Sequence, residues 1–223
     1  TQDDLGLDDT RDGPRLWTAF AKLAPDLGYE HALQVGLSYA HNDQHQEAHE
    51  ELEEHAPGDE HETDAILTGL EGDADRWGLD LVYKYDGVGD RGHRDFKLQA
   101  EYLRVIKDTR VSSGDADLLG SALKFTTDGL YVQGTYGVWP RWNLGLRYDV
   151  LGLTNKARGA DDRDFGSSDR WSVGLTWDPS EFSRLRLQYA WNDIWVTAQE
   201  KERFQAFYLQ FLMSLGAHGA HTF

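Results

Sequence analysis

Strict alternation of apolar and polar residues runs through most of the chain. Between positions 142 and 150, for example, Trp142, Leu144, Leu146, Tyr148 and Val150 alternate with polar residues or glycine. A period of two gives a β-strand one apolar and one polar face. The pattern recurs in 15–24, 31–40, 77–85, 96–102, 130–138, 171–177, 185–191 and 207–215. The sequence therefore predicts an all-β chain with about nine strands.

The connections between these segments alternate in length. The short ones are 25–30, 87–94, 139–141 and 178–183, and the long ones are 41–75, 107–127, 151–169 and 192–204. Outer-membrane barrels join their strands by short periplasmic turns and long external loops. The alternation therefore predicts an antiparallel transmembrane β-barrel in which all the long connections are external.

The polar face carries charges that suit a water-filled lumen. The candidate lumen residues are Asp80, Lys84, Lys97, Glu101, Arg147, Asp149 and Arg186. They could set ion selectivity, or they could form a structural network that fills a narrow barrel. The apolar face would then contact lipid, and its aromatic residues gather near both strand ends, as in the belts at membrane interfaces. A soluble β-sandwich with these aromatics in its core is the alternative.

Composition excludes several other classes. The chain has 223 residues with 39 acidic and 22 basic side chains, a net charge of −17 that argues against nucleic-acid binding. No stretch approaches the roughly 18 apolar residues of a membrane-spanning helix. The absence of Cys excludes disulfides and thiolate sites and fits an oxidising compartment. No phosphate loop or catalytic triad is evident, so we expect no enzyme. Because Met is missing at position 1, we expect a mature form or a fragment.

The first long connection is the one concentrated chemical feature. Its candidate metal ligands are His41, His45, His49, Glu53, His55 and His61. In a helix, the histidines spaced four apart would stack on one face, and Glu53 would continue the row. Imidazoles with a carboxylate suit Zn²⁺ or a similar ion, and 43–75 contains no Lys or Arg. A solvated acidic loop without metal is the alternative.

The C-terminal tail carries two further features. A terminal aromatic residue such as Phe223 is the usual mark by which the barrel-assembly machinery recognises its substrates. The alternating register here passes through His221, Gly219 and Ala217, so the tail fits either the membrane or a periplasmic extension. His218 and His221 are candidates for an exit-side metal site or for ordinary interfacial histidines.

Several stretches together resemble a known family. They are DADRWGLDLVYKYDG (73–87), FKLQAEYLR (96–104), GLYVQGTYGVWPRWNLGLRYDVL (129–151), SEFSRLRLQY (180–189) and YLQFLMSLGAHGAHTF (208–223). These are similar to proteobacterial outer-membrane barrel proteins catalogued as zinc-regulated, as TonB-dependent-receptor-like or as uncharacterised porins. The resemblance implies that 1–223 is the C-terminal portion of a larger barrel. An odd strand count agrees, because bacterial single-chain barrels have even numbers.

The sequence thus predicts a location and a broad function. We expect a porin-like barrel in the outer membrane of a Gram-negative bacterium, passing or taking up small solutes, with divalent metal ions such as zinc as the favoured cargo. A structural barrel that sheathes or docks a periplasmic or membrane partner is the chief rival. An outer-membrane hydrolase is a third class, which would require a Ser or His pair at the outer rim.

Overall fold

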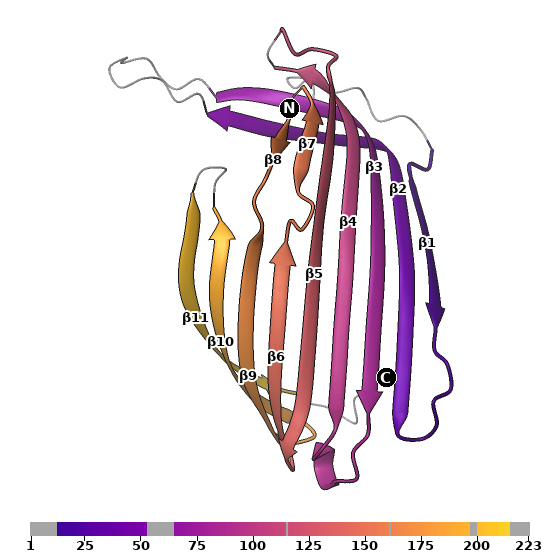
Figure 1. Cartoon of the computed structure of the whole chain (residues 1–223), viewed down its shortest axis with the longest axis vertical. Helices are drawn as coiled ribbons and strands as arrows, with labels where there is room; N and C mark the ends of the chain where they lie inside the picture. The colour runs from indigo at the N-terminus through magenta and orange to yellow at the C-terminus, as the bar shows by residue number, and fades with distance from the viewer. Residues whose placement is uncertain (1–12, 53–64, 115, 161, 197–199, 215–223) are drawn as a thin grey trace.

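One antiparallel sheet contains all the strands of the computed structural model, which describes residues 13–52, 65–114, 116–160, 162–196 and 200–214 (Figure 1). The strands are β1 (Leu16–Leu23), β2 (His31–Leu52), β3 (Ala65–Tyr85), β4 (Phe96–Ser113), β5 (Ala122–Trp139), β6 (Trp142–Leu151), β7 (Lys156–Gly159), β8 (Arg163–Asp164), β9 (Ser168–Ser180), β10 (Ser183–Trp195) and β11 (Lys201–Met213). A short 3₁₀ turn, η2 (Asp90–Gly92), precedes β4. None of the described residues forms a helix long and apolar enough to cross a membrane.

The strands lie side by side in chain order. The main path is β1-β2-β3-β4-β5-β6-β9-β10-β11, while the short β7 pairs with β5 and with β8. Each of the segments predicted from alternation overlaps one strand of this path, which confirms the all-β antiparallel fold. Strands β7 and β8 were not predicted, because they are short and fall inside the connection expected at 151–169.

The long connections are shorter than the sequence suggested. The loop expected at 41–75 is wrong over most of its length, because β2 continues to Leu52 and β3 already begins at Ala65. Likewise β4 and β5 take up much of the connection expected at 107–127. Backbone pairing holds these extensions together without an apolar pattern, so alternation did not reveal them. We call the end of the sheet that carries the short turns the turn end, and the opposite end the outer end. In Figure 1 the outer parts of β2 and β3 turn aside from the common strand direction.

The sheet has no second layer packed against its apolar face. Leu79, Leu144 and Leu146 are 52%, 45% and 54% exposed, although a sandwich would bury all three. Among the described residues, Leu70 is the one large side chain that is fully buried. The soluble-sandwich alternative is therefore wrong. An exposed apolar surface of this extent needs an apolar environment.

The two edges of the sheet are β1 and β11. Within the described residues β1 pairs only with β2, β11 pairs only with β10, and no pairing joins the two edges. The sheet is therefore open. Each edge presents one row of backbone N–H and C=O groups without a strand partner in this part of the chain.

Hydrogen bonds between neighbouring short turns hold one end of the sheet together. The backbone N–H of Arg141 donates to the carbonyl of Arg91 at 2.9 Å, and that of Asp178 donates to the carbonyl of Arg141 at 2.9 Å. The Arg141 guanidinium also donates to the carbonyl of Pro179 at 2.6 Å. Arg141 has a φ of 68°, a left-handed conformation that is uncommon outside glycine. These contacts offset that strain and fix the level at which the strands turn.

Gly36 of β2 leaves room for the side chain of Asp80, its direct partner on β3. A Cβ at position 36 would lie 1.9 Å from the Asp80 carboxylate, whereas the nearest atom to a Cβ at Gly145 is 3.5 Å away. We expect Gly36→Ala to lower the free energy of unfolding by about 1 kcal/mol, because the Asp80 side chain must rotate. Gly145→Ala should be close to neutral.

Denaturant unfolding of the folded protein measures both variants. The penalty of Gly36→Ala should disappear in an Asp80→Ala background, since no carboxylate then occupies the space. An equal penalty in both backgrounds would show that the clash is not its cause.

Candidate functional site

All the residues expected in a lumen lie on one face of the sheet, which we call the polar face. Residues directly opposite each other in an antiparallel pair share a face. Asp80 pairs with Glu101, and Lys84 pairs with Lys97. The row through Glu101 continues by direct pairing to Tyr131, Asp149 and Arg170. Arg147 lies two residues before Asp149, and Arg186 is on the same face opposite Thr176.

Asp149 is the centre of a charge cluster on this face. The Arg147 guanidinium donates to both Asp149 carboxylate oxygens, with Nε distances of 2.8 and 3.0 Å and an Nη2 distance of 2.6 Å. Arg170 donates to Oδ2 of the same carboxylate at 3.2 Å. The Arg147 guanidinium also lies 4.0 Å from the centre of the Tyr131 ring. The Asp149 carboxylate therefore binds two guanidinium groups, and Glu101, paired with Tyr131 in the same row, is a second carboxylate near Arg147.

A hollow in the polar face lies beside this cluster. Gly145 of β6 and Gly174 of β9 are directly paired, so neither strand contributes a side chain there. A Cβ at Gly145 or Gly174 would meet its nearest neighbour at ordinary contact distance, 3.5 Å and 3.6 Å respectively. No neighbouring side chain therefore fills the space above these two glycines. The hollow is lined by Gln133, Thr135, Asn143, Arg147, Ser172, Thr176, Arg186 and Gln188. Hydrogen-bonding groups thus surround a floor of bare backbone.

Lys84, Lys97 and Arg186 are cations of the polar face for which no ion pair is seen among the described residues. Arg186 makes one long hydrogen bond, 3.4 Å from its Nε to Oγ1 of Thr176. Lys84 and Lys97 oppose each other directly across β3 and β4. A direct cross-strand pair of like charges is unfavourable for the sheet.

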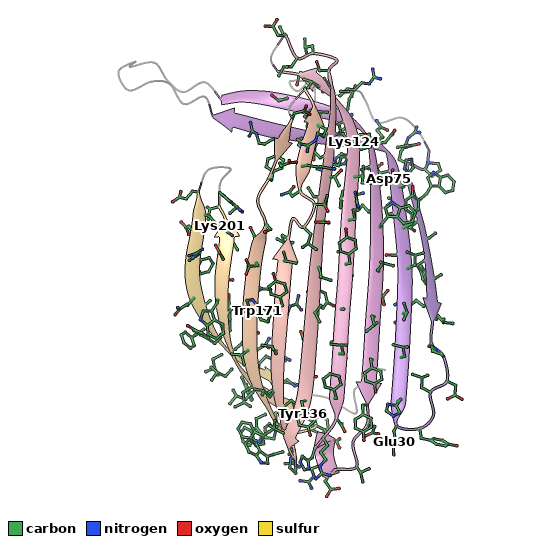
Figure 2. All side chains as sticks on the ribbon, viewed as in Figure 1. Glu30, Asp75, Lys124, Tyr136, Trp171 and Lys201 are labelled. Atoms are coloured by element: carbon green, nitrogen blue, oxygen red, sulfur yellow. The ribbon has the colours of Figure 1, made fainter. Side chains whose placement is uncertain are left out.

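Aromatic residues mark two levels on the apolar face. The rings of Tyr39 and Trp77 lie 4.4 Å apart near the middle of β2 and β3, and those of Tyr148 and Trp171 lie 4.5 Å apart. At the turn end, the rings of Trp142 and Trp177 stack at 5.6 Å. Figure 2 shows Tyr136 near the turn end, Trp171 at middle height and Asp75 toward the outer end. The aromatic rings thus form an inner belt at the turn end and an outer belt near the middle of the long strands β2 and β3 (Figure 2).

The histidine spacing does not produce the expected helix. Residues 41–52 belong to β2, and four residues of extended strand span about 13 Å, too far for two imidazoles to share one ion. A register shift between Asn42 and His45 also changes the face. His41 pairs with Asp75 whereas His45 pairs with Gly72, so the two histidines lie on opposite faces.

Both of these histidines have carboxylate neighbours instead. His41 Nδ1 lies 2.9 Å from Asp75 Oδ1, and His45 Nε2 lies 3.2 Å from Glu47 Oε2. The side chain of His49 and all of Glu53, His55, His61, His218, His221 and Phe223 lie outside the described residues. Within the part that the structure describes, no group of three or more metal-ligating side chains comes together.

The contact between His41 and Asp75 lies beyond the outer aromatic belt and predicts a titration. The hydrogen bond to Asp75 raises the pKa of His41, and hydrogen bonds from Tyr39 and His41 lower the pKa of Asp75. The stabilisation from protonated His41 is complete below an ordinary His pKa of about 6.5 and is lost as pH rises through the higher folded value. An NMR titration of His41 should therefore have its midpoint above about 6.5.

Asp75→Asn should move that midpoint toward the ordinary value. Asp108→Asn is the matched control, because Asp108 binds Lys124 at 2.9 Å and does not contact His41. A His41 midpoint that is the same in the parent protein and in Asp75→Asn would contradict the contact.

Sequence reasoning missed several side chains of the polar face. Arg170 was missed because the alternating segment was read as starting at Trp171. Tyr131 and Gln133 alternate with the apolar residues of β5, so the same period could have identified them. The proximity of Tyr131 and Gln133 to Arg147 depends on the register between β5 and β6, which alternation alone does not give.

Comparisons with known proteins agree with this architecture. The model of the family described as "TonB dependent receptor-like, beta-barrel" matches residues 1–192. An uncharacterised protein of Aquifex aeolicus (strain VF5) is 31% identical over 225 residues, covering 99% of this chain and 43% of the relative. The chain thus spans less than half the length of that curated relative.

Two solved structures are similar at a low level. OmpT, expressed in the outer membrane of Vibrio cholerae, has a TM-score of 0.45 and 14% identity over 86% of this chain and 48% of its own. The outer-membrane channel DcaP of Acinetobacter baumannii has a TM-score of 0.37 and 13% identity over 86% of this chain and 59% of its own. Both scores are below the level that establishes a common fold.

Proposed function

Because the chain belongs to the family of TonB-dependent receptor-like β-barrels, we propose that it forms part of a porin-like barrel in the outer membrane of a Gram-negative bacterium. The apolar face contacts lipid, the polar face lines a water-filled lumen, and small solutes pass along it. The proposal assigns the chain no chemical reaction.

The single observation that carries this proposal is the two-faced, one-layer sheet. Its apolar face is exposed, with Leu79 and Leu146 more than half accessible, and its other face carries the cluster around Asp149. On β3 the aromatic belts are Trp77 and Tyr83–Tyr85, and the stretch from 77 to 85 reaches the lower limit of the roughly 9–11 residues of a tilted membrane strand.

The open edges favour a barrel that further strands complete. A bilayer offers no water to the edge groups of β1 and β11, so a spanning sheet must close. The chain covers 43% of its Aquifex relative, which leaves length for such strands. We propose that strands from outside residues 1–223 pair with both edges.

Passage of solute is favoured over a purely structural role by the hollow at Gly145 and Gly174. A barrel that only sheathes a partner gains nothing from a polar recess in its wall, whereas a conduit needs open, hydrated surface. The sheath alternative predicts a lumen filled by another chain and no conductance.

Zinc as cargo stays a separate prediction. Its remaining support is the acidic, histidine-rich composition of 43–75, because His41 and His45 do not face each other. Titration calorimetry of the folded protein with Zn²⁺, compared with a His45→Ala/His49→Ala variant, tests it. Equal binding by both proteins, or none by either, would remove zinc as a cargo-specific feature.

Single-channel recording tests the main proposal. The protein that carries this chain, reconstituted in planar lipid bilayers, should give discrete ohmic conductance steps. Protein that is shown to be folded and inserted but gives no conductance would contradict the conduit and favour the sheath.

A further inference from the structure

The charges on the polar face are unevenly distributed along the strands. Toward the outer end, Asp149 binds both Arg147 and Arg170. Closer to the turn end, Lys84, Lys97 and Arg186 have no ion-pair partner among the described residues. The acidic and basic groups of this face are therefore not a self-neutralising network.

The carboxylates Asp80 and Glu101 of β3 and β4 compensate the charge of Lys84 and Lys97 only weakly. Lys84 and Asp80 are four residues apart, as are Lys97 and Glu101, a separation of about 13 Å in an extended strand. The Debye length is about 8–10 Å at moderate salt, so those carboxylates are largely screened. Two turn residues, Asp86 and Asp95, lie two positions from Lys84 and Lys97 respectively, about 7 Å of strand, and compensate part of the charge of these lysines. Asp95 Oδ1 also accepts a hydrogen bond from the Gly87 N–H at 2.9 Å.

The outer acidic segment does not cancel this positive region either. Asp75 and Lys84 are nine residues apart on β3, which corresponds to about 30 Å of strand. That is roughly three Debye lengths. The net charge of −17 for the whole chain therefore does not give the sign of the local charge on the polar face at the turn end.

Arg186 combines an unpaired charge with available space. Its guanidinium lines the hollow over Gly145 and Gly174, and its one hydrogen bond there is long, 3.4 Å to Thr176. Asn143 and Gln188 add side-chain amide donors to the same hollow. A guanidinium with free donors beside amide groups is suited to a carboxylate or a phosphate, whose oxygens accept several hydrogen bonds at once.

We propose that this hollow is a binding site for a small solute that carries a carboxylate or phosphate group, with Arg186 as the anchoring residue. Lys84 and Lys97 add a positive field that draws the anion along the lumen. This role gives a reason for the direct pairing of Lys84 with Lys97, because an anion that passes between the two ammonium groups offsets their repulsion. This inference rests on the proposed function, since it requires the polar face to line a water-filled lumen.

Selectivity in planar bilayers is the first test. With the reconstituted protein in a KCl gradient, the reversal potential should show a preference for chloride over potassium. Arg186→Gln and the double variant Lys84→Gln/Lys97→Gln should each reduce that preference several-fold. Lys124→Gln is the matched control, because Lys124 binds Asp108 on the outer extension and should leave the preference unchanged.

Block of the chloride current is the second test, with succinate and inorganic phosphate as separate probes. The more effective blocker identifies the group that the hollow prefers. Arg186→Gln should weaken block about tenfold, the effect of losing a charged hydrogen-bond donor. Gly145→Leu should also weaken it, because the side chain fills the hollow without changing charge.

The outcomes separate this inference from the proposed function. A channel that conducts but prefers potassium would overturn the anion site and leave the conduit intact. The same conclusion would follow if each probe blocked the Arg186→Gln variant as well as it blocks the parent protein. A folded, inserted protein without conductance would overturn both.

Discussion

Replacing Leu146 with arginine is expected to lower the free energy of unfolding of the folded protein by about 2–4 kcal/mol, the cost of a cation at the bilayer midplane on a lipid-facing strand. Leu146 lies in the middle of β6 between the two aromatic belts and is 54% exposed in the sheet. In water, an arginine at such an exposed position would cost little. The size of the effect therefore reports lipid on that face.

Gln99→Arg is the matched control for Leu146→Arg. Gln99 lies in β4 between Lys97 and Glu101, on the polar face, where a charged side chain reaches water. Denaturant unfolding in lipid vesicles should show a change of less than about 1 kcal/mol for Gln99→Arg. Equal penalties for the two variants would contradict the assignment of the faces.

Asp149→Ala should destabilise the protein by about 2 kcal/mol, because it leaves two guanidinium groups together without their shared carboxylate. The Asp149 side chain is 19% exposed, against 32% for Arg147 and 40% for Arg170, so water compensates only part of the loss. Denaturant unfolding of the folded protein measures the change.

Asp193→Ala gives the comparison for Asp149→Ala. Asp193 also binds two cations, Lys201 and Arg203, each at 3.3 Å, but Arg203 is 83% exposed. An exposed cluster of this kind should contribute less than about 1 kcal/mol. If Asp149→Ala costs no more than Asp193→Ala, the cluster around Asp149 has no structural role.

The sequence could predict the strands of the membrane-spanning region because lipid and water impose opposite demands on their faces. Leu144, Leu146 and Tyr148 alternate with Asn143, Gly145 and Arg147 for that reason. The outer extensions of β2 and β3 carry no period of two in their sequence, so they were read as loop. Backbone pairing and scattered side-chain contacts such as His41–Asp75 maintain them, and no sequence pattern reports either.

The candidate site depended on register, which single-strand periodicity does not contain. The choice of polar residues on each strand followed from alternation, but the direct pairing of Lys84 with Lys97 and of Gly145 with Gly174 required the relative shift of neighbouring strands. The histidine spacing was misleading for a related reason. A single register shift after Asn42 placed His41 and His45 on opposite faces.

The most direct test of the central claim, that one face of the sheet contacts lipid and the other lines water, is a spin-label scan of β6. The chain contains no cysteine, so a single cysteine at each position from 143 to 148 can be labelled in the protein reconstituted in vesicles. Labels at 144, 146 and 148 should collide preferentially with oxygen, which partitions into lipid, and labels at 143, 145 and 147 with a water-soluble nickel complex. Loss of this two-residue alternation, or shielding of 144 and 146 from both reagents, would contradict it.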